Sequence, residues 1–360
     1  YKKGTDSVGQ ECSEDSFYPI ENLKLKTFRG NRFVISDFVI DKSNIKARDG
    51  LEATGLFSRI GQAGLGQTSI IIDGVTLQNF DVKGNGCTYA GALVGLIDSG
   101  CTDAQISGVL VMKGTDSSDK SSVTGAKNCG GIIGYSNVNG TGSSDGLKLT
   151  NCTVAGTLVG INGTSTAENA GGLIGLLGGR YADIRNSYAS GMTSDGIYSR
   201  EESKCNIRAT GYAGGLIGYI YSPSEWSEGK YHSVMDSFST CSVAGNEGGG
   251  GLVGSDMNTT TDYKRCYSAG PVVKVKSSGG FYGGFAGIID ATTLDDCSYN
   301  KNVYTSADDM KGAGQGGDAK IAEKTTKEME VSGECKTQVY DSTLTGTYPY
   351  RPVNTTGIVL

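Results

Sequence analysis

Few residues in this chain could carry acid–base or nucleophilic chemistry. His232 is the only histidine among 360 residues, so any Ser-His-Asp or Cys-His arrangement would have to use it as the base. It lies between Tyr231 and Ser233, with no nucleophile motif beside it. A His-Glu-x-x-His helix, which would indicate a zinc peptidase, is absent from the sequence. The sequence therefore predicts no catalytic residue and places His232 on the surface.

Adjacent carboxylates are the second possible source of catalysis. Three such pairs occur, Asp295–Asp296, Asp308–Asp309 and Glu201–Glu202. Glycosidases use two carboxyl groups that flank one bond, whereas neighbours on a strand point to opposite faces. An adjacent pair therefore cannot act on one substrate. A pair assembled from two separate coils stays open, and it would make the protein a polysaccharide-cleaving enzyme.

The cysteines do not predict a metal centre. Ten are present, none in a Cys-x-x-Cys pair, and one histidine is too few to complete the usual zinc sets. Calcium-binding Gly-Gly-x-Gly-x-Asp runs are also absent from the sequence. We expect neither a metal nor another cofactor.

The same cysteines favour secretion. An even number of cysteines is typical of a disulfide-bonded extracellular protein, and free buried thiols are the alternative. Five Asn-x-Ser/Thr sequons point the same way and mark N-glycosylation candidates. These are Asn139, Asn151, Asn162, Asn258 and Asn354. We expect an extracellular or cell-surface location.

Composition narrows the classes of partner. Lysine and arginine number 32 against 38 aspartates and glutamates, so the net charge is −6. The most basic stretch, 24–32, is interrupted by apolar residues, and no concentrated basic face for nucleic acid is visible. No apolar run approaches the roughly 20 residues that a membrane-spanning helix needs. We therefore expect neither nucleic-acid binding nor a membrane span.

Glycine is abundant, with 57 residues, and its placement reveals a repeat. Two small residues, two apolar residues and a glycine recur in fixed order, and a shorter copy, Gly55-Leu56-Phe57, precedes them. The six full blocks are 91–95, 130–134, 171–175, 214–218, 250–254 and 283–287. Such fixed order distinguishes the chain from a flexible glycine-rich linker.

A second signature follows each block and alternates apolar with polar residues, as a half-buried strand does. Examples are 149–156, 184–191, 234–241, 264–270 and 294–299. Cys266 and Cys297 occupy equivalent positions in successive copies. If one repeat is one coil, stacked positions lie about 4.8 Å apart, within disulfide range. We expect these two cysteines to form a disulfide.

These elements define the expected fold. Each repeat offers two or three short strands and cannot bury its own apolar face, whereas stacked repeats can. The predicted fold is all-β, a parallel β-helix (β-solenoid) of about six to seven coils with long loop insertions. We divide it into a lead-in and cap at 1–50, repeats at 51–300, and a C-terminal cap and tail at 301–360.

The two caps should protect the open ends of the solenoid. Thr325 and Glu328 have the spacing of a capping box, which predicts a short helix over Thr326 to Val331. We expect this helix to cover the last coil, because bare edge strands invite uncontrolled pairing. The segment from Phe33 to Ile40 could do the same at the first coil.

The blocks resemble the GLUG motif, a glycine-rich repeat of bacterial and protist surface proteins. The lead-in 35–40, followed by the short block at 55–57, is similar to the opening of such arrays. The segment 325–329 is similar to their closing segment, so the resemblance covers roughly residues 30 to 335. It implies a secreted or cell-surface array linked to adhesion, and it brings no catalytic residues. The high cysteine count and the long polar insertions depart from the pattern.

The paired apolar positions suggest a route to assembly. In a regular strand one column would fill the lumen and the next would face outward, and an exposed apolar stripe is usually covered by a partner. A bulge between the positions would instead turn both columns inward. The outward stripe would consist of Val94, Ile133, Ile174, Ile217, Val253 and Ala286.

The sequence thus favours an extracellular structural protein, a fibre subunit or a surface adhesin, that self-associates through solenoid faces and through its terminal segments 348–352 and 357–360. Glycans are a second class of partner. The alternative function is a polysaccharide-binding or polysaccharide-cleaving β-helix. A cluster of carboxylates and aromatic residues on one face would favour that alternative, although the 19 tyrosines are scattered along the sequence.

Overall fold

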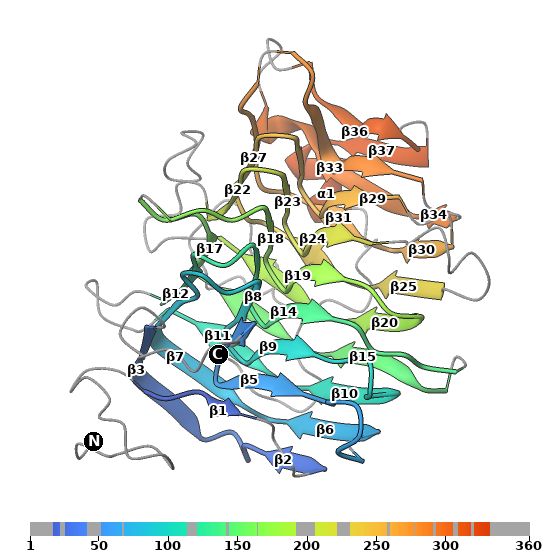
Figure 1. Ribbon diagram of the computed structural model, residues 1–360. Coiled ribbons are helices and arrows are strands. Elements are labelled where there is room, and N and C mark those ends of the chain that lie inside the picture. Colours follow the sequence, from blue (N-terminus) through green and yellow to red (C-terminus); the bar gives the residue numbers. More distant parts are fainter. Residues whose placement is uncertain are drawn as a thin grey trace.

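The computed structural model is nearly all β-strand, and every strand pair in the described part of the chain is parallel (Figure 1). The structure describes residues 17–21, 26–41, 52–66, 68–113, 121–141, 144–163, 165–191, 206–221, 231–257, 260–276, 278–290, 293–304, 309–317 and 320–331. Three sheets run along the molecule, and the chain passes through them in turn. The fold is that of a parallel β-helix.

Sheet I has 15 strands in two limbs that one long strand joins. In spatial order it consists of β1 (Ile20–Glu21), β5 (Phe57–Ile60), β9 (Val94–Ile97), β14 (Ile133–Ser136), β19 (Ile174–Leu177), β24 (Ile217–Ile220), β29 (Val253–Asp256), β33 (Phe281–Ile289), β28 (Gly248–Gly250), β23 (Tyr212–Gly214), β18 (Asn169–Gly171), β13 (Asn128–Gly130), β8 (Tyr89–Gly91) and β4 (Ala53–Thr54), with β36 (Lys311–Gly316) paired to β33.

Sheet II has eight strands, and sheet III has 14. Sheet II consists of β2 (Thr27–Arg29), β6 (Ser69–Asp73), β10 (Asp103–Ser107), β15 (Gly146–Thr150), β20 (Tyr181–Arg185), β25 (Tyr231–Met235), β30 (Thr261–Lys264) and β34 (Thr293–Asp295). Sheet III consists of β32 (Val272–Lys274), β27 (Val243–Gly245), β22 (Ile207–Ala209), β17 (Thr157–Gly160), β12 (Ser121–Thr124), β7 (Thr76–Lys83), β11 (Leu110–Met112), β16 (Thr153–Ala155), β21 (Tyr188–Ser190), β26 (Phe238–Ser239), β31 (Tyr267–Ser268), β35 (Cys297–Asn300) and β37 (Ile321–Lys324), with β3 (Val34–Asp41) paired to β7.

The glycine blocks lie where the two limbs of sheet I meet. In the block 91–95, β8 ends at Gly91, the chain bends at Ala92–Leu93, and β9 begins at Val94. The equivalent residues of successive blocks are paired in register, as Val94 with Ile133 and Ile133 with Ile174. The expected vertical alignment of the blocks is therefore present.

The bend buries both apolar columns, so the predicted outward stripe is wrong. Val94, Ile133, Ile174, Val253 and Ala286 are 0% exposed and Ile217 is 1% exposed, and all six belong to the main core cluster. Leu93 and its equivalents lie in the same core. The physical reason is that the chain turns between the two limbs. The outer side of the turn carries glycine, and the inner side carries both apolar residues.

Glycine is required at this bend by close approach of the backbone. A Cβ atom at Gly91 would lie 2.2 Å from the carbonyl oxygen of Val94 and 2.7 Å from the amide nitrogen of Gly134. At Gly175, the third glycine of its block, a Cβ atom would lie 2.7 Å from the carbonyl oxygen of Cys129 in the preceding coil. Side chains are excluded at both positions because the two limbs touch backbone to backbone.

The second signature forms the corner between sheets II and III. Each copy places one residue at positive φ, with Gly74 and Gly108 at this position in the first coils. Five later residues hold the same backbone conformation, with φ between 48° and 55°: Asn151, Asn186, Asp236, Arg265 and Asp296. Glycine, asparagine and aspartate tolerate this left-handed region best, which explains most of the residues at this position.

Strands on both sides of the predicted repeat region join the same sheets. In the lead-in, β1, β2 and β3 pair with β5, β6 and β7. In the C-terminal part, β36 pairs with β33, and β37 pairs with β35. The three sheets therefore extend beyond residues 51–300 in both directions. No helix in the described ranges is long and apolar enough to cross a membrane.

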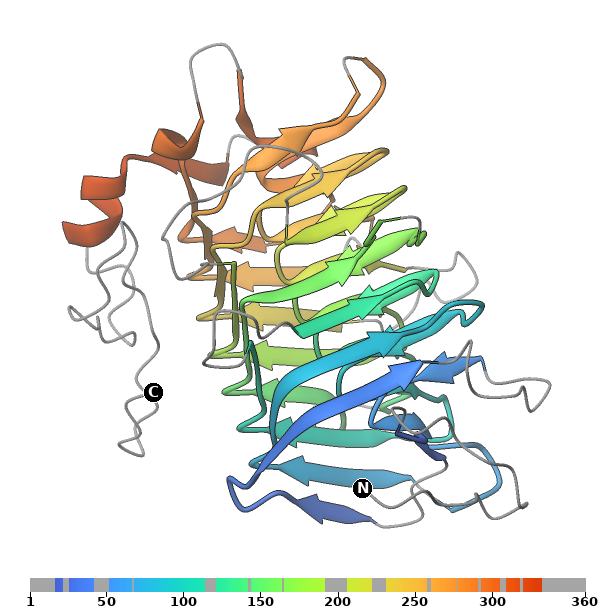
Figure 2. The same ribbon diagram turned by 90° about the vertical axis from the view of Figure 1, so that its left-hand side faces the viewer.

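The predicted capping-box helix is present. Apart from the short 3-10 helix η3 (Lys301–Val303), α1 (Thr326–Val331) is the only helix in the described ranges. The Thr325 hydroxyl donates to the Glu328 carboxylate at 2.7 Å, and the Glu328 amide donates back to the hydroxyl at 3.1 Å. The sequence predicts that this helix covers the last coil, but the helix lies elsewhere. Met329 belongs to a buried cluster beside sheet III that also contains Tyr188, Phe238 and Tyr267, so α1 covers a side of the solenoid (Figure 2).

Candidate functional site

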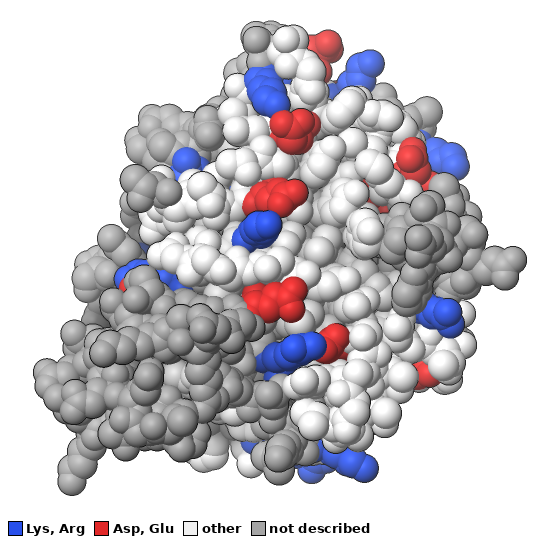
Figure 3. Space-filling model, in the orientation of Figure 1, with Lys and Arg blue, Asp and Glu red and all other residues white. Residues whose placement is uncertain are grey.

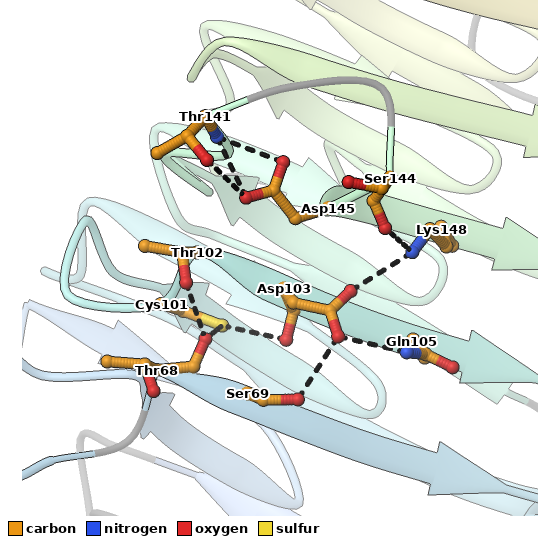
Figure 4. Close-up of polar contacts among 10 residues, drawn as sticks. All are labelled: Thr68, Ser69, Cys101, Thr102, Asp103, Gln105, Thr141, Ser144, Asp145 and Lys148. Carbon is orange, nitrogen blue, oxygen red and sulfur yellow. Dashed lines mark hydrogen bonds and ion pairs between the residues drawn. The ribbon is translucent and has the colours of Figure 1, made fainter.

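The outer face of sheet II carries a network of polar contacts (Figure 4). The Asp103 carboxylate on β10 accepts hydrogen bonds from Ser69 Oγ at 3.1 Å, Gln105 Nε2 at 2.9 Å and Lys148 Nζ at 3.2 Å. The donors come from three successive coils. The network therefore ties coils together and uses the carboxylate fully.

The neighbouring loop is held in the same way. The Asp145 carboxylate accepts from the Thr141 amide at 2.9 Å and from the Thr141 hydroxyl at 2.8 Å (Figure 4). Within the described ranges, no group of three or more histidine, cysteine or acidic side chains could hold a metal ion. We interpret these contacts as structural, since each carboxylate already has its donors.

The outer face of sheet I carries a different kind of surface. Five tyrosines gather there, beside the glycine bend, and we call them the tyrosine face. They are Tyr89, Tyr135, Tyr212, Tyr219 and Tyr221. Four of them are half-buried, and Tyr221 is 44% exposed.

Strand register explains how these residues meet. Tyr89 and Tyr212 belong to one column, in which Asn128 and Asn169 fill the two coils between them. The Asn169 amide donates to the Asn128 side-chain oxygen at 2.9 Å within this column. Tyr135 and Tyr219 belong to the column on the other side of the bend, with Leu176 between them. The fifth, Tyr221, directly follows β24.

The rings contact one another across the bend. The ring centroids of Tyr89 and Tyr135 are 4.8 Å apart. Those of Tyr212 and Tyr219 are 5.5 Å apart with an interplanar angle of 17°, and Tyr219 lies 6.4 Å from Tyr221. Such contacts fix ring orientation, so the surface exists before any ligand arrives.

Glycines in neighbouring coils let the rings lie close to the sheet. A Cβ atom at Gly248, one coil beyond Tyr212 in the same column, would lie 3.0 Å from that ring. A Cβ atom at Gly178 would lie 2.9 Å from the Tyr135 hydroxyl oxygen. A larger residue at either glycine would push the ring outward.

Charged residues flank the rings. Arg59 forms an ion pair with Asp98, and Lys276 forms one with Glu247 at 2.7 Å. Burial, with a smaller effect from the Glu52 and Asp98 charges, raises the pKa of Tyr89. Burial followed by the Glu247 charge raises the pKa of Tyr212. Both phenols are therefore neutral at physiological pH and can donate and accept hydrogen bonds.

Figure 3 shows this face, with acidic and basic side chains following one another up its middle. The strand register places Glu52, Lys127, Glu168 and Glu247 in one column next to the rings, with Thr88 and Gly211 at the positions between them. Flat rings, neutral hydroxyls and mixed charges are groups for binding a partner. Sequence reasoning missed the tyrosine face, because its residues come from different columns and from coils of unequal length.

The predicted sequons differ in their surroundings. Asn151 is exposed at the corner between sheets II and III, and Asn162 is exposed in the segment after β17. Asn139 is half-buried, and its side-chain oxygen is buried. Asn258 and Asn354 lie outside the described residues. Asn151 and Asn162 therefore offer the more accessible side chains for glycosylation.

The predicted disulfide is absent from the structure. The pairing of Tyr267 with Ser298 places Cys266 beside Cys297 in the next coil, as we had expected. Both are nevertheless free, buried thiols. The physical reason is that each thiol donates a hydrogen bond to a backbone carbonyl oxygen. Cys266 Sγ donates to the Val234 oxygen at 3.3 Å, and Cys297 Sγ donates to the Tyr263 oxygen at 3.6 Å.

The other described cysteines are free as well: Cys87, Cys101, Cys129, Cys152 and Cys241. Burial raises the pKa of the Cys129 and Cys152 thiols to about 12. The described cysteines are therefore buried thiols, which was the alternative to disulfide bonds. Cys12, Cys205 and Cys335 lie outside the described residues.

His232 is not a surface residue, contrary to the expectation. It lies on β25 and is 0% exposed. Its position in the strand alternation is inward, like that of Ala182, with which it pairs in the preceding coil. A histidine inside the solenoid does not reach a substrate at the surface.

Comparison with known proteins gives little further information. No model of a known protein family matches the chain, and no curated protein matches it. Among solved structures, the chain is similar to a protein from Bacteroides ovatus whose crystal structure is described as that of a "putative immunoglobulin A1 protease". The match has 17% sequence identity and a TM-score of 0.44, and it covers 94% of this chain and 92% of the other. A similarity of this size carries no inference about activity.

Proposed function

We propose that this protein is a non-enzymatic, extracellular binding protein of the adhesin type that holds its partner on the tyrosine face. In this proposal the β-helix, with six to seven coils of the glycine-block kind and one rung of strands at each end, is a rigid support. The resemblance to GLUG repeats, which implies surface arrays linked to adhesion, fits this role.

The tyrosine face carries the proposal. Tyrosine is enriched at the centres of binding surfaces because it offers a large, rigid contact area and a polar hydroxyl group. Here five rings lie on one side of the molecule, as a contacting pair and a contacting group of three, and ring contacts and underlying glycines hold them in place. Preorganised side chains lose little conformational entropy when a partner binds.

One observation bears on the self-association that the sequence favours. Lateral assembly through the apolar stripe loses its basis, because those side chains are buried. The terminal segments 348–352 and 357–360, which could add to a neighbouring copy, lie outside the described residues. Extracellular location is supported by the exposed sequons at Asn151 and Asn162. Adhesion to another molecule therefore stands ahead of fibre formation.

A bead-adhesion assay tests the proposal. Beads coated with the protein should adhere to surfaces coated with extracellular matrix, and the combined variant Tyr135→Ala, Tyr219→Ala, Tyr221→Ala should lose at least 90% of this adhesion. The matched control is Tyr181→Ala with Tyr231→Ala, which removes two tyrosines that occupy paired positions in neighbouring strands of sheet II. Equal adhesion of the two variants, at equal Tm, would refute a role for the tyrosine face.

A further inference from the structure

We infer that the tyrosine face binds an uncharged, linear glycan that lies along the axis of the solenoid. This inference rests on the proposed function and names the class of ligand.

The arrangement of the rings indicates a chain-like ligand. Tyr135 and Tyr219 occupy one column two coils apart, which corresponds to about 9.6 Å along the axis. Tyr89 and Tyr212 occupy the other column three coils apart, or about 14 Å. The rings therefore offer contacts at successive points along one line. A polymer can use all of them, whereas a compact small molecule reaches only one ring pair.

The electrostatics indicate an uncharged ligand. The two arginine and lysine side chains that flank the rings, Arg59 and Lys276, are paired with Asp98 and Glu247. In the adjacent column, Lys127 lies one coil from Glu168, so that column has no run of positive charge. A sulfated or carboxylated glycan would need such a run, because its affinity comes largely from basic side chains. Hydroxyl groups, in contrast, can donate to these carboxylates and to the phenol oxygens.

The limited apolar exposure favours a glycan over a protein partner. Protein interfaces usually have an apolar core that becomes fully buried. Of the aliphatic residues in the same column as Tyr135 and Tyr219, Leu96 and Ile288 are each 4% exposed, and Leu176, between the two tyrosines, is half-buried. What remains accessible is ring surface, part of the Leu176 side chain and polar groups. Sugar rings match this combination, since they present C–H faces to aromatic rings and hydroxyl groups to polar side chains.

Titration calorimetry on the whole chain tests the inference. The uncharged probes are β1,4-linked hexasaccharides of glucose and of mannose; the charged probes are heparin and galacturonate hexamers. We expect at least one uncharged probe to bind and both charged probes to bind at least tenfold more weakly. Tyr219→Ala should reduce the affinity at least tenfold, which corresponds to 1.4 kcal/mol. Tyr219→Phe, which keeps the ring, should reduce it less.

Each contrary outcome has a defined meaning. Lack of binding to every uncharged probe, or tighter binding of heparin, overturns the inference. So does an unchanged affinity in Tyr219→Ala. The control pair Tyr181→Ala, Tyr231→Ala should bind the uncharged probes normally, which separates loss of the site from loss of the fold.

The bead assay separates this inference from the proposed function. Periodate oxidation destroys vicinal diols of glycans and should abolish adhesion if the ligand is a glycan. Adhesion that survives periodate but still requires the tyrosine face would overturn the glycan inference and leave the proposed adhesive function intact, with a protein as the partner.

Discussion

The last glycine of each block determines how closely successive coils pack. Gly175 lies against the backbone of Cys129. A Cβ atom placed on Gly95 would lie 2.6 Å from the backbone nitrogen and the carbonyl oxygen of Thr54. Ser58 takes the equivalent position in the first copy, where its side chain is tolerated and Ser58 Oγ lies 3.5 Å from the Ile20 oxygen. The crowding therefore arises only where a complete coil lies on the preceding side.

Gly175→Ala should destabilise the protein by about 1–3 kcal/mol, the usual cost of forcing extra atoms into a packed interior. The neighbours of the new Cβ are backbone atoms and cannot rotate away. Thermal unfolding followed by circular dichroism measures the effect. Ser58→Ala is the matched control and should leave Tm almost unchanged, and a similar shift in both variants would contradict the close-approach account.

The left-handed corner residues allow a second test at the same scale. Asn186 has φ of 48° and occupies the place that Gly74 and Gly108 hold in earlier coils. Asn186→Gly should keep the stability of the parent protein. Asn186→Val should cost about 1–2 kcal/mol, because a β-branched side chain clashes in this conformation. Urea unfolding distinguishes the two, and equal midpoints would contradict the role assigned to this position.

At the scale of the element, Met329 is the buried side chain of α1 among those that the structure describes. It is 6% exposed and belongs to one buried cluster with the stacked rings of Tyr188, Phe238 and Tyr267. The ring centroids of Tyr188 and Phe238 are 4.8 Å apart, and those of Phe238 and Tyr267 are 4.7 Å apart. A helix of six residues is marginal alone in water, so its order comes from docking.

Met329→Ala should release α1 from sheet III. Hydrogen exchange of the amides of α1 should become at least tenfold faster, because the helix loses the buried side chain that holds it. Exchange in sheet II should stay as in the parent protein. Lys327→Ala, at an exposed position of the same helix, serves as the control. Unchanged protection in Met329→Ala would show that the capping box alone maintains the helix.

Sequence patterns predicted some elements well and others badly, for identifiable reasons. The helix α1 has the bounds that the capping box predicted, because its signal is local. Its location was wrong, because the ring stack that receives Met329 is assembled from three coils. The alignment of glycine blocks could be predicted from their spacing. The inward turn of Val94 could not, since period-two alternation fails where a strand bends.

At the scale of the whole molecule, the core contains many protonated thiols. Burial raises the pKa of Cys101, Cys129, Cys152, Cys241 and Cys297 from 9.0 to about 12. Thiols of the unfolded chain ionise near pH 9, whereas these remain protonated until about pH 12. Between these values the unfolded state has fewer bound protons than the folded state, so the free energy of unfolding falls as the pH rises.

Removing one thiol should therefore reduce this alkaline sensitivity. Cys152→Ser should be about 2–3 kcal/mol less sensitive than the parent protein when the pH rises from 8 to 11. Serine suits this site, because Ser187 and Ser237 hold the same place in the next coils and bond to the backbone there. Urea unfolding at the two pH values gives the comparison, and parallel losses in both proteins would contradict a contribution from Cys152.

The tyrosine face could not be predicted from the spacing of tyrosines in the sequence. Tyr89, Tyr135 and Tyr212 are 46 and 77 residues apart in turn, with no common interval. They lie on one face of the solenoid because the coils differ in length by their loops and because two columns join across the bend. Strand register brings these tyrosines to one face. The register becomes known only when every loop has been assigned to its coil.

Backbone contact at the glycine bend also sets how the molecule could change in evolution. Each coil contacts the preceding coil through equivalent backbone atoms. A coil duplicated in the gene would therefore pack against its neighbours on both sides. The rod would grow by about 4.8 Å and remain straight-sided. Its length would then rise in fixed steps, and the number of rings presented to a long ligand would rise whenever the duplicated coil carries a tyrosine at these positions.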